Sequence, residues 1–436
     1  MDCDAVEKKS IHFNCIITHR MYRNSIRIIL LLIVLLCCRG HGYANRIRVC
    51  AQCQYTSVKA AIAAAGAHDT VFILKGIYRE NDIPISKPMV ILGAEGAVID
   101  AENKEGIFLV AADSVTISGL TLNNIGRSHT KDLAGIKTLR VKEFLFENNT
   151  FNNPFFAFHI QKSKRGIIRN NVIHGNAINE FDSGNGIHMW HCSNIEVTDN
   201  KVDHMRDGIY FEFVKHSKVS GNVSKENIRY GLHFMFSNND EYSHNLFEHN
   251  GAGVAVMFSK YIFMRYNTFR LNWGTASYGL LLKEIYDAEI KHNTFEGNTI
   301  GINADGSTRI NVEENDFINN GWAVKFLGAC YSNKFLRNNF IGNAFEIAYK
   351  GSLNSNIFDK NFWGEYTGYD LDKDDYGDVP YRPVKLFSYV VNKTPETIVL
   401  LRSLFVDIIN FSEKVSPIFT PDALKDEHPR MKKMKW

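Results

Sequence analysis

The feature that most constrains this chain is a short motif that recurs about every 22 residues. The motif has an apolar residue, two variable positions, an asparagine, any residue and a second apolar residue, as in residues 146–151 and 168–173. Steps of 22, 29, 22, 23, 22, 26, 22 and 23 residues separate its asparagines, which are Asn149, Asn171, Asn200, Asn222, Asn245, Asn267, Asn293, Asn315 and Asn338. A period of this length predicts a solenoid in which each repeat packs against its neighbours.

A second motif follows each asparagine by about eight residues and begins with glycine, as in Gly208-Ile209-Tyr210-Phe211. The first and third residues after the glycine are apolar, and this alternation is typical of a strand that buries one face. Two or three such strands make one coil, and coils stack at about 4.8 Å, the spacing of hydrogen-bonded strands. We therefore predict an all-β, right-handed parallel β-helix over residues 68–365.

We assign the repeated asparagines a structural role. Asparagine tolerates the left-handed backbone of a turn, and stacked amide side chains hydrogen-bond to one another along a ladder. A tenth copy of the motif at residues 358–362 continues the period, and we place Lys360 at its asparagine position.

The N-terminal segment has the pattern of a secretory signal peptide, which we assign to residues 1–44, with Met21 as a possible start. The apolar run at 28–38 follows two arginines, and small residues stand at the cleavage positions of 42–44. An uncleaved membrane anchor is the alternative, but the run is well short of the roughly 20 residues that span a bilayer. We therefore expect an exported protein.

Removal of this leader changes the charge and the cysteine content. The leader carries six of the 50 basic and three of the 47 acidic residues, so the mature chain is neutral. A neutral chain has no general attraction to nucleic acid, and we predict no such partner. Four of the eight cysteines remain, which is too few for a disulfide scaffold of this size.

Both ends of the coil stack need covers, because open coils expose apolar surface and strand edges. We assign residues 45–67 to an N-terminal cap that contains a short helix. After the coils we expect an acidic loop and connector at 366–394. Apolar residues at helical spacing in 395–411 predict an amphipathic helix within a C-terminal segment 395–436. This helix either caps the last coil or docks on a partner, and we expect the basic end at 430–436 to be mobile.

Several side chains on the outward face of the strands could bind a soft metal. If the first and third residues after each glycine point inward, the second and fourth point outward and form columns. His233, Met235 and Met257 then lie close together, with His188 and Glu212 on neighbouring coils. Thioether and imidazole ligands suit Cu(I). The alternative is that these residues are ordinary surface side chains.

Two further groups of residues have metal-ligand spacing. Cys50 and Cys53 form either a small disulfide or a metal-binding dithiol, which makes them a second candidate copper site. Carboxylates at every second position of an acidic loop suggest a calcium site, although the loop lacks the glycine and the bidentate glutamate of an EF-hand. The residues proposed for calcium are Asp370, Asp372, Asp374 and Asp378.

Segments that flank the coils resemble a known family. They are SVKAAI at 57–62 followed by GIY at 76–78, PMVILG at 88–93 followed by VID at 98–100, and GDVPYRPV at 377–384. Together with the repeats they are similar to NosD, the family of periplasmic accessory proteins for maturation of nitrous oxide reductase. The resemblance covers essentially the whole mature chain.

The resemblance implies function but no ligand set. It implies a partner ABC transporter, with a NosF ATPase and a NosY membrane subunit, through which the protein would contact the membrane. It also implies delivery of copper to the copper–sulfur centre of the reductase. The His and Met columns are inferred from the residues alone, and Cys50 and Cys53 are not part of the family motif.

Two other functions compete with copper delivery. Parallel β-helices also occur as polysaccharide lyases, hydrolases and epimerases, and fold alone does not decide function. The candidate catalytic residues for such an enzyme are Asp182, Asp207, Glu212 and Lys283, although they form no compact acid–base pair in the sequence. The other alternative is an adaptor that docks the transporter to the reductase and binds no metal. We predict a protein that is not an enzyme.

Overall fold

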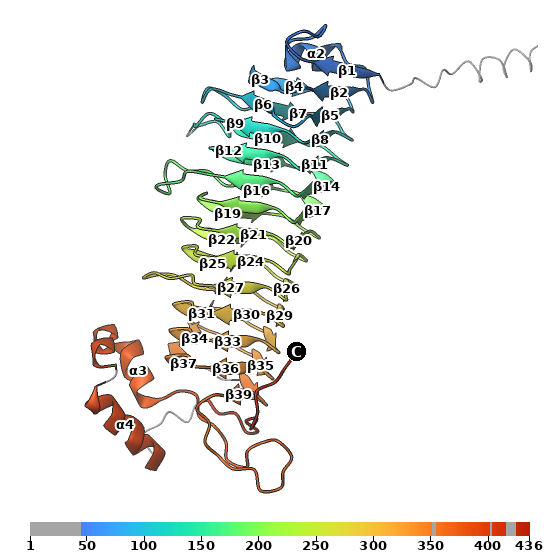
Figure 1. The fold of residues 1–436 in the computed structure, drawn as a ribbon. Coiled ribbons are helices and arrows are strands. Elements are labelled where there is room, and N and C mark those ends of the chain that lie inside the picture. The colour runs from blue at the N-terminus through green and yellow to red at the C-terminus, as the bar shows by residue number, and fades with distance from the viewer. Residues whose placement is uncertain (1–44, 129, 351–354, 402, 416–423) are drawn as a thin grey trace, which may run out of the picture. The chain divides into compact units, whose positions relative to one another are not determined.

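The described part of the chain folds as a parallel β-helix. A computed structural model describes residues 45–128, 130–350, 355–401, 403–415 and 424–436, so the predicted signal peptide lies outside the described residues. Figure 1 shows the coils stacked one on another from β1 near the N-terminal end to β39. Within the described residues the strands form three parallel sheets of 14, 13 and 12 strands, which we call sheets A, B and C. The predicted fold class is confirmed.

Each complete coil contributes one strand to each sheet in the order A, B, C, whereas β1 adds a strand to sheet A alone and the last coil gives only β38 and β39. Sheet A contains β1 (Arg46–Val49), β2 (Thr70–Ile73), β5 (Val90–Gly93), β8 (Thr116–Ser118), β11 (Leu145–Glu147), β14 (Lys164–Arg169), β17 (Ser193–Thr198), β20 (Lys218–Ser220), β23 (Glu241–Ser243), β26 (Phe263–Arg265), β29 (Glu289–Lys291), β32 (Asn311–Glu313), β35 (Lys334–Leu336) and β38 (Ile357–Asp359). Sheet B contains β3 (Gly76–Arg79), β6 (Ala97–Asp100), β9 (Thr121–Asn123), β12 (Thr150–Asn152), β15 (Val172–His174), β18 (Lys201–Asp203), β21 (Val223–Lys225), β24 (Leu246–Glu248), β27 (Thr268–Arg270), β30 (Thr294–Glu296), β33 (Asp316–Ile318), β36 (Asn339–Ile341) and β39 (Phe362–Trp363). Sheet C contains β4 (Ile83–Ile85), β7 (Phe108–Val110), β10 (Ala134–Leu139), β13 (Phe156–Gln161), β16 (Ile187–Trp190), β19 (Asp207–Glu212), β22 (Tyr230–Met235), β25 (Ala252–Met257), β28 (Leu280–Lys283), β31 (Ile300–Asp305), β34 (Trp322–Leu327) and β37 (Phe345–Lys350).

The apolar alternation of sheet C follows the prediction. On β19, Ile209 and Phe211 are fully buried and pair with Leu232 and Phe234 of β22, which are also fully buried. The residues between them lie on the outer face. Stacking therefore repeats the same inward and outward columns from coil to coil, which places outward residues of neighbouring coils side by side.

The repeated asparagines form a buried ladder, as predicted, but for a different reason. Asn171 Oδ1 accepts hydrogen bonds from the backbone N–H of Asn149 at 3.0 Å and from its Nδ2 at 3.2 Å. The left-handed residue is the one before each ladder position, such as Asn148 with φ of 55°. The asparagines are thus selected for hydrogen bonding inside the turn. Our placement of Lys360 was wrong by one residue, since Asn361 continues the ladder.

A second ladder was missed. Its members are Asn227, Asn250, Asn272, Asn298, Asn320 and Asn343, and each amide oxygen accepts the backbone N–H of the coil before it. They stand five residues after the members of the first ladder, a spacing that is visible in the sequence. Two internal columns of hydrogen bonds therefore hold the coils in register.

At the start of the sheet C strands from β16 to β31, glycine avoids a close contact with the next coil. A Cβ at Gly231 would lie 2.6 Å from the carbonyl oxygen of Gly253 in the next coil, and one at Gly253 would lie 2.5 Å from the carbonyl oxygen of Gly279. In β37, the last strand of this sheet, Glu346 occupies the equivalent position. No strand of sheet C follows it in the described residues, so a long side chain fits there.

The N-terminal cover is the predicted helix. It is α2 (Val58–Ala64), with Ser57 as its N-cap accepting the backbone N–H of Ala60 at 3.2 Å. Its buried residues Val58, Ala61 and Ile62 join the core of the coils. The segment 45–67 also contains β1, which pairs with β2 of sheet A, so strand pairing begins before residue 68.

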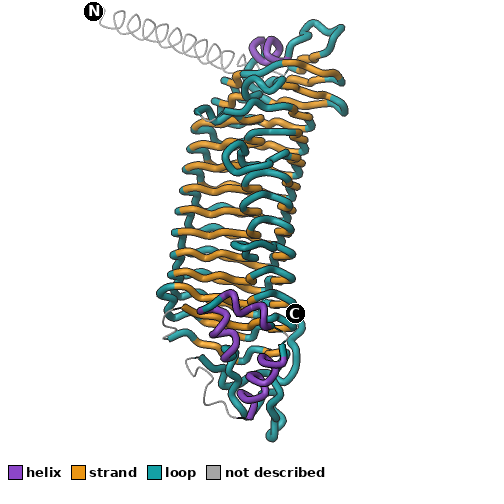
Figure 2. Tube along the Cα trace, turned by 90° about the vertical axis from the view of Figure 1, so that its left-hand side faces the viewer, coloured by secondary structure: helices purple, strands orange, loops and turns teal. Residues whose placement is uncertain are grey.

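The C-terminal helices pack on the side of sheet C. They are α3 (Leu386–Lys393), a 3-10 helix η1 (Pro395–Leu400) and α4 (Leu404–Val415), and α3 lies in the segment expected to be a connector. Figure 2 shows helix beside the last coils. Phe387 and Val391 of α3 pack with Trp322 and Phe345 of the outer face. Among the described residues, no helix combines the length and hydropathy needed to cross a membrane.

Residues 424–436 cover the last coil. Asp426 accepts hydrogen bonds from the backbone N–H and Nδ2 of Asn361, both at 3.0 Å, and from Trp363 Nε1 at 2.9 Å, and so ends the first ladder. The backbone N–H of Arg430 donates to the carbonyl of Asn361 at 2.9 Å. In the segment that we expected to be mobile, the backbone N–H groups of Arg430 and Met434 are thus hydrogen-bonded to the last coils.

Candidate functional site

A column of rings lies on the outer face of sheet C. His159, His188, Tyr210 and His233 are register partners on β13, β16, β19 and β22. Their ring centroids are 4.8 Å apart from His159 to His188, 4.8 Å from His188 to Tyr210 and 4.6 Å from Tyr210 to His233. Tyr210 therefore stands between the two histidines that the sequence proposed as ligands of one site.

The predicted methionines lie beside the last ring of this column. Met235 and Met257 are register partners on β22 and β25, and Glu212 precedes them on β19. His233 is two residues from Met235 on the same face of one strand. The hydroxyl of Tyr210 donates a hydrogen bond to Met235 Sδ at 3.5 Å. The structure thus brings His233, Met235, Met257 and Glu212 together.

The histidines are buried without hydrogen-bond partners. His233 is 5% exposed, and among the described residues neither of its ring nitrogens has a partner. Both ring nitrogens of His188 also lack one. A buried polar group without a partner costs about 1–3 kcal/mol, so such groups call for a partner from outside the chain. The free imidazole nitrogens are the strongest sign of a binding site on this face.

Burial also keeps two of the column histidines neutral. Burial, reinforced by His159 and Arg206, lowers the pKa of His188 to about 3. Burial lowers the pKa of His159 to about 4, against the opposing effect of Asp132. A neutral imidazole keeps its lone pair at physiological pH, which a metal ligand requires.

Asp207 is a site residue whose role the sequence did not show. Its side chain is fully buried and accepts hydrogen bonds from Arg229 Nε at 2.9 Å and Nη2 at 2.5 Å. Burial alone would raise the pKa of Asp207, but His233 and Arg229 lower it to about 2. Its Oδ2 lies 3.8 Å from His233 Nδ1. A carboxylate behind one ring nitrogen favours a proton there and leaves Nε2 free to bind a metal.

Comparison with known proteins identifies the relatives of this chain. A family model described as Periplasmic copper-binding protein (NosD) matches residues 169–370, which include β16, β19, β22 and β25. The chain is thus similar to NosD proteins over this region. Two relatives carry the name Probable ABC transporter binding protein NosD. The one from Stutzerimonas stutzeri is 25% identical over 403 residues, 81% of this chain and 85% of the relative.

The second NosD relative is from Pseudomonas aeruginosa. It is 25% identical over 406 residues, 82% of this chain and 87% of the relative. Among solved structures, the A-module of the mannuronan C-5 epimerase AlgE4 from Azotobacter vinelandii is similar with a TM-score of 0.49 and 16% identity. That likeness covers 69% of this chain and 88% of the module and concerns the fold alone.

Asp207 and Glu212, two of the residues considered for a polysaccharide enzyme, do not form an acid–base pair. Asp207 and Glu212 are the first and last residues of β19, roughly 16 Å apart by the rise of a strand. Glycosidases hold their two carboxyl groups about 5–9.5 Å apart. Asp182 lies in the loop after β15, and Lys283 follows Met257 in register. The bidentate bonds from Arg229 also leave Asp207 unsuited to proton transfer at neutral pH.

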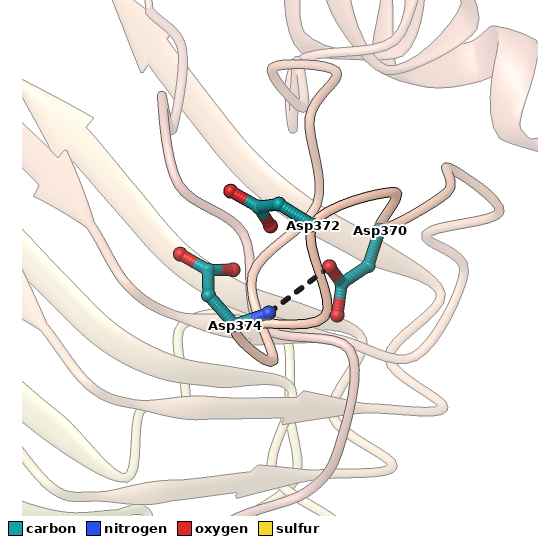
Figure 3. Close-up of side chains that lie close together, drawn as sticks. All are labelled: Asp370, Asp372 and Asp374. Carbon is teal, nitrogen blue, oxygen red and sulfur yellow. Dashed lines mark hydrogen bonds between the residues drawn. The ribbon is translucent and has the colours of Figure 1, made fainter.

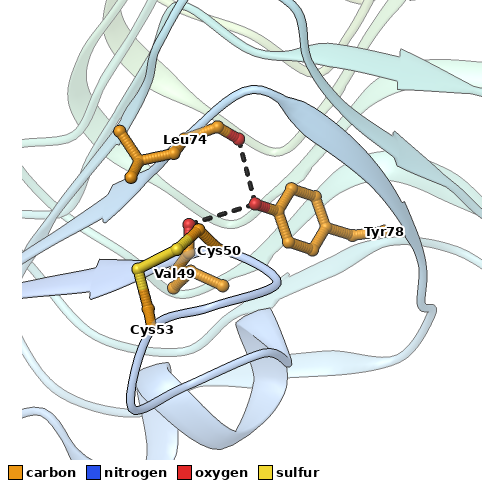
Figure 4. The surroundings of a disulfide bond; sticks show 5 residues. All are labelled: Val49, Cys50, Cys53, Leu74 and Tyr78. Atoms are coloured by element: carbon orange, nitrogen blue, oxygen red, sulfur yellow. Dashed lines mark hydrogen bonds between the residues drawn. A yellow bond between two sulfur atoms is a disulfide. The ribbon is translucent and has the colours of Figure 1, made fainter.

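The structure pairs Cys50 and Cys53 in a disulfide in the first coil (Figure 4). Beside it, the hydroxyl of Tyr78 donates hydrogen bonds to the carbonyls of Val49 at 3.0 Å and Leu74 at 2.9 Å. A metal-binding cysteine must be a thiolate, so this pair binds metal only after reduction. In the oxidised form its contribution is to the N-terminal turn.

Three of the four carboxylates proposed for calcium converge in the acidic loop (Figure 3). Asp370, Asp372 and Asp374 each place an oxygen within 4.8 Å of the others, whereas Asp378 accepts the backbone N–H of Leu371. The Asp370 carboxylate accepts three backbone N–H groups of its own loop, including that of Asp374. These bonds explain the turn without an ion, and calcium binding stays a prediction.

Proposed function

We propose that this protein is a periplasmic accessory protein that binds Cu(I) and hands it to the copper–sulfur centre of nitrous oxide reductase. In this role it works with an ABC transporter of the NosF and NosY type and is a carrier rather than an enzyme. The observation that carries the proposal is the buried His233, with unpartnered ring nitrogens, beside two methionines in register. The names of the family model and of the two relatives point the same way.

The donor set fits the proposed cargo. The imidazole of His233 and the sulfurs of Met235 and Met257 are soft ligands, which favour Cu(I) over harder ions. Asp207, which Arg229 holds in place, lies behind the ring, and Tyr210 covers one side of it. A site made of few ligands on an outer face suits a metal that must later be released. His188 is separated from this group by Tyr210, so we place it outside the primary site.

The test is an anaerobic Cu(I) titration of the mature protein against a competing chelator. The triple variant His233→Ala, Met235→Leu, Met257→Leu is expected to lose affinity about 100-fold or more, since outer-shell changes alone cost 10–100-fold. The matched control is His292→Ala, because His292 stacks on Tyr266 at 4.8 Å, on another turn, as His233 stacks on Tyr210. The control is expected to bind as the wild type.

Each other result would redirect the assignment. Tight binding that survives in the triple variant would contradict this site and point to Cys50 and Cys53, which a titration with and without prior reduction would test. No binding by the wild type would reject copper carriage and leave the metal-free adaptor between transporter and reductase.

A further inference from the structure

A stack of aromatic residues lines the turn between sheets C and A. It consists of His191, Phe213, Phe236 and Phe258, which we call the aromatic turn. Successive ring centroids are 4.6, 5.1 and 5.2 Å apart. All four residues have left-handed backbones, with φ between 51° and 53°. A bulky residue in this conformation is uncommon and calls for an explanation.

The fold itself does not require rings at these positions. Further along the stack the same turn position is occupied by Glu284, Gly306 and Gly328, all with positive φ. Phe213 and Phe236 also remain 37% and 36% exposed, so their burial does not account for them. Partly exposed aromatic side chains on neighbouring coils are typical of a surface that a partner covers.

The aromatic turn borders the proposed copper site. Each of its rings directly follows the last residue of a sheet C strand, so Phe236 follows Met235 and Phe258 follows Met257. A molecule seated on these rings would therefore lie within reach of the two methionine sulfurs.

A row of lysines runs along the other side of the aromatic turn. One column of turn residues contains four lysines, which are Lys142, Lys164, Lys215 and Lys260. Ser193 and Asn238 occupy the same column on the coils between them, and β-bridges pair neighbouring members. All four are exposed. Among the described residues none of the four has a carboxylate within 4.0 Å, whereas Arg165 beside them is paired with Glu143. The row thus presents unneutralised positive charge in a chain whose mature form is neutral overall.

We propose that the aromatic turn and the lysine row form a docking surface for a folded protein with an acidic contact surface, and that this protein is the acceptor of the copper. The second part rests on the proposed function. Aromatic residues are enriched at protein interfaces, and a row of unpaired lysines selects carboxylates and accelerates their approach. Docking here would place the acceptor against Met235 and Met257 and shorten the path of the transferred ion.

The test measures binding of purified apo nitrous oxide reductase to the full-length protein by surface plasmon resonance at two salt concentrations. The variant Phe213→Asn, Phe236→Asn, Phe258→Asn removes the rings, and asparagine accepts the left-handed backbone. The matched control is Tyr266→Asn, a half-exposed ring with φ of 55° in a stack on another turn. A second variant, Lys215→Glu with Lys260→Glu, tests the charge.

The ring variant is expected to bind the reductase roughly tenfold or more weakly, as loss of interface aromatic residues usually does, with Cu(I) affinity unchanged. The lysine variant should lose a similar factor at low salt and most of its salt dependence. The copper-site variant His233→Ala, which changes a buried ligand and keeps both methionines, should dock like the wild type. That result separates a failure of docking from a failure of copper binding.

The proposal is overturned if the ring variant binds like the wild type, or if Tyr266→Asn weakens binding as much. It is also overturned if the wild type does not bind the reductase, whatever the copper titration shows. Binding of an acidic polysaccharide such as alginate at the aromatic turn, without binding of the reductase, would assign this surface to a sugar polymer instead.

Discussion

The outer face of sheet C differs sharply between its middle and its C-terminal end. In the middle, this face carries His188, Tyr210 and His233, and the ring nitrogens of the two histidines have no hydrogen-bond partner in the described part of the chain. At the end, the same face carries Trp322 and Phe345, whose rings lie 4.2 Å apart. Helix α3 covers these two residues, with the ring of Phe387 6.1 Å from that of Phe345.

The comparison shows that one backbone supports two uses of the same face. The inward columns are alike in both regions because every coil must fill the core and match its neighbours. The outward residues do not have to fill the core, so their types can differ from one region to the other. At the C-terminal end, large apolar outward residues pack against the C-terminal helices. In the middle, imidazole and thioether side chains and a buried carboxylate form the candidate metal site.

The largest expected effect concerns the covered end. Phe345→Ala should lower the free energy of unfolding by about 3 kcal/mol or more, because it opens a cavity under α3 and removes two ring contacts. Met257→Ala, on the open part of the face, should cost about 1 kcal/mol because that side chain is only half-buried. Urea denaturation followed by circular dichroism measures both. Equal losses would show that the two regions are packed alike.

The next effect is a pH dependence at the covered end. Burial raises the pKa of Glu346 from 4.5 to about 8, with Glu365 adding to the shift and Asn343 and Lys385 opposing it. The folded state therefore binds more protons than the unfolded state between about pH 4.5 and 8, and stability falls as pH rises through this window. Glu346→Gln should remove this slope and raise stability at pH 8 by on the order of 2 kcal/mol.

Hydrogen exchange of α3 and β37 across pH 5–9 checks this prediction, with the exposed Glu284→Gln as a control that should leave the slope intact. A slope that persists in Glu346→Gln would assign the pH dependence to another group, such as the buried Asp240, whose pKa burial raises to about 7.

The smallest expected effect lies in the open region. Asp207→Asn removes the carboxylate behind His233 and should weaken Cu(I) binding about tenfold, the lower end of the usual cost of losing such a group. Asp287→Asn is the matched control, since Asp287 also forms a bidentate pair with an arginine, Arg309, away from the site. Nitrogen NMR should show the proton of His233 on Nδ1 in the wild type and a mixed tautomer in Asp207→Asn. An unchanged tautomer would remove Asp207 from the site.

Much of the fold followed from the period of the sequence. The first asparagine ladder, the apolar alternation of sheet C and helix α2 were all predicted, because each depends on spacing along the chain. The second ladder had the same kind of signal and was missed. Helix α3 was also missed, since the short connector that contains it shows its apolar face only against Trp322 and Phe345.

The candidate site was predictable in part. Alternation placed His233, Met235 and Met257 on one face, and the structure agrees. It could not show that Tyr210 separates His188 from them, because ring stacking depends on side-chain rotamers. The alternation also could not show the role of Asp207. This residue lies at the start of its strand, before the alternating positions begin, so the pattern does not predict that it lies near His233.

The sequence by itself determined the coil, its length and which side chains face the core, because a solenoid repeats one local pattern and each coil contacts only its neighbours. The tertiary structure alone decided which outward residues are covered and which remain open. That choice depends on where α3 and residues 424–436 pack back on the coils. Contacts between residues far apart in the chain leave no period in the sequence, so the site and its covers emerge only when the chain is folded.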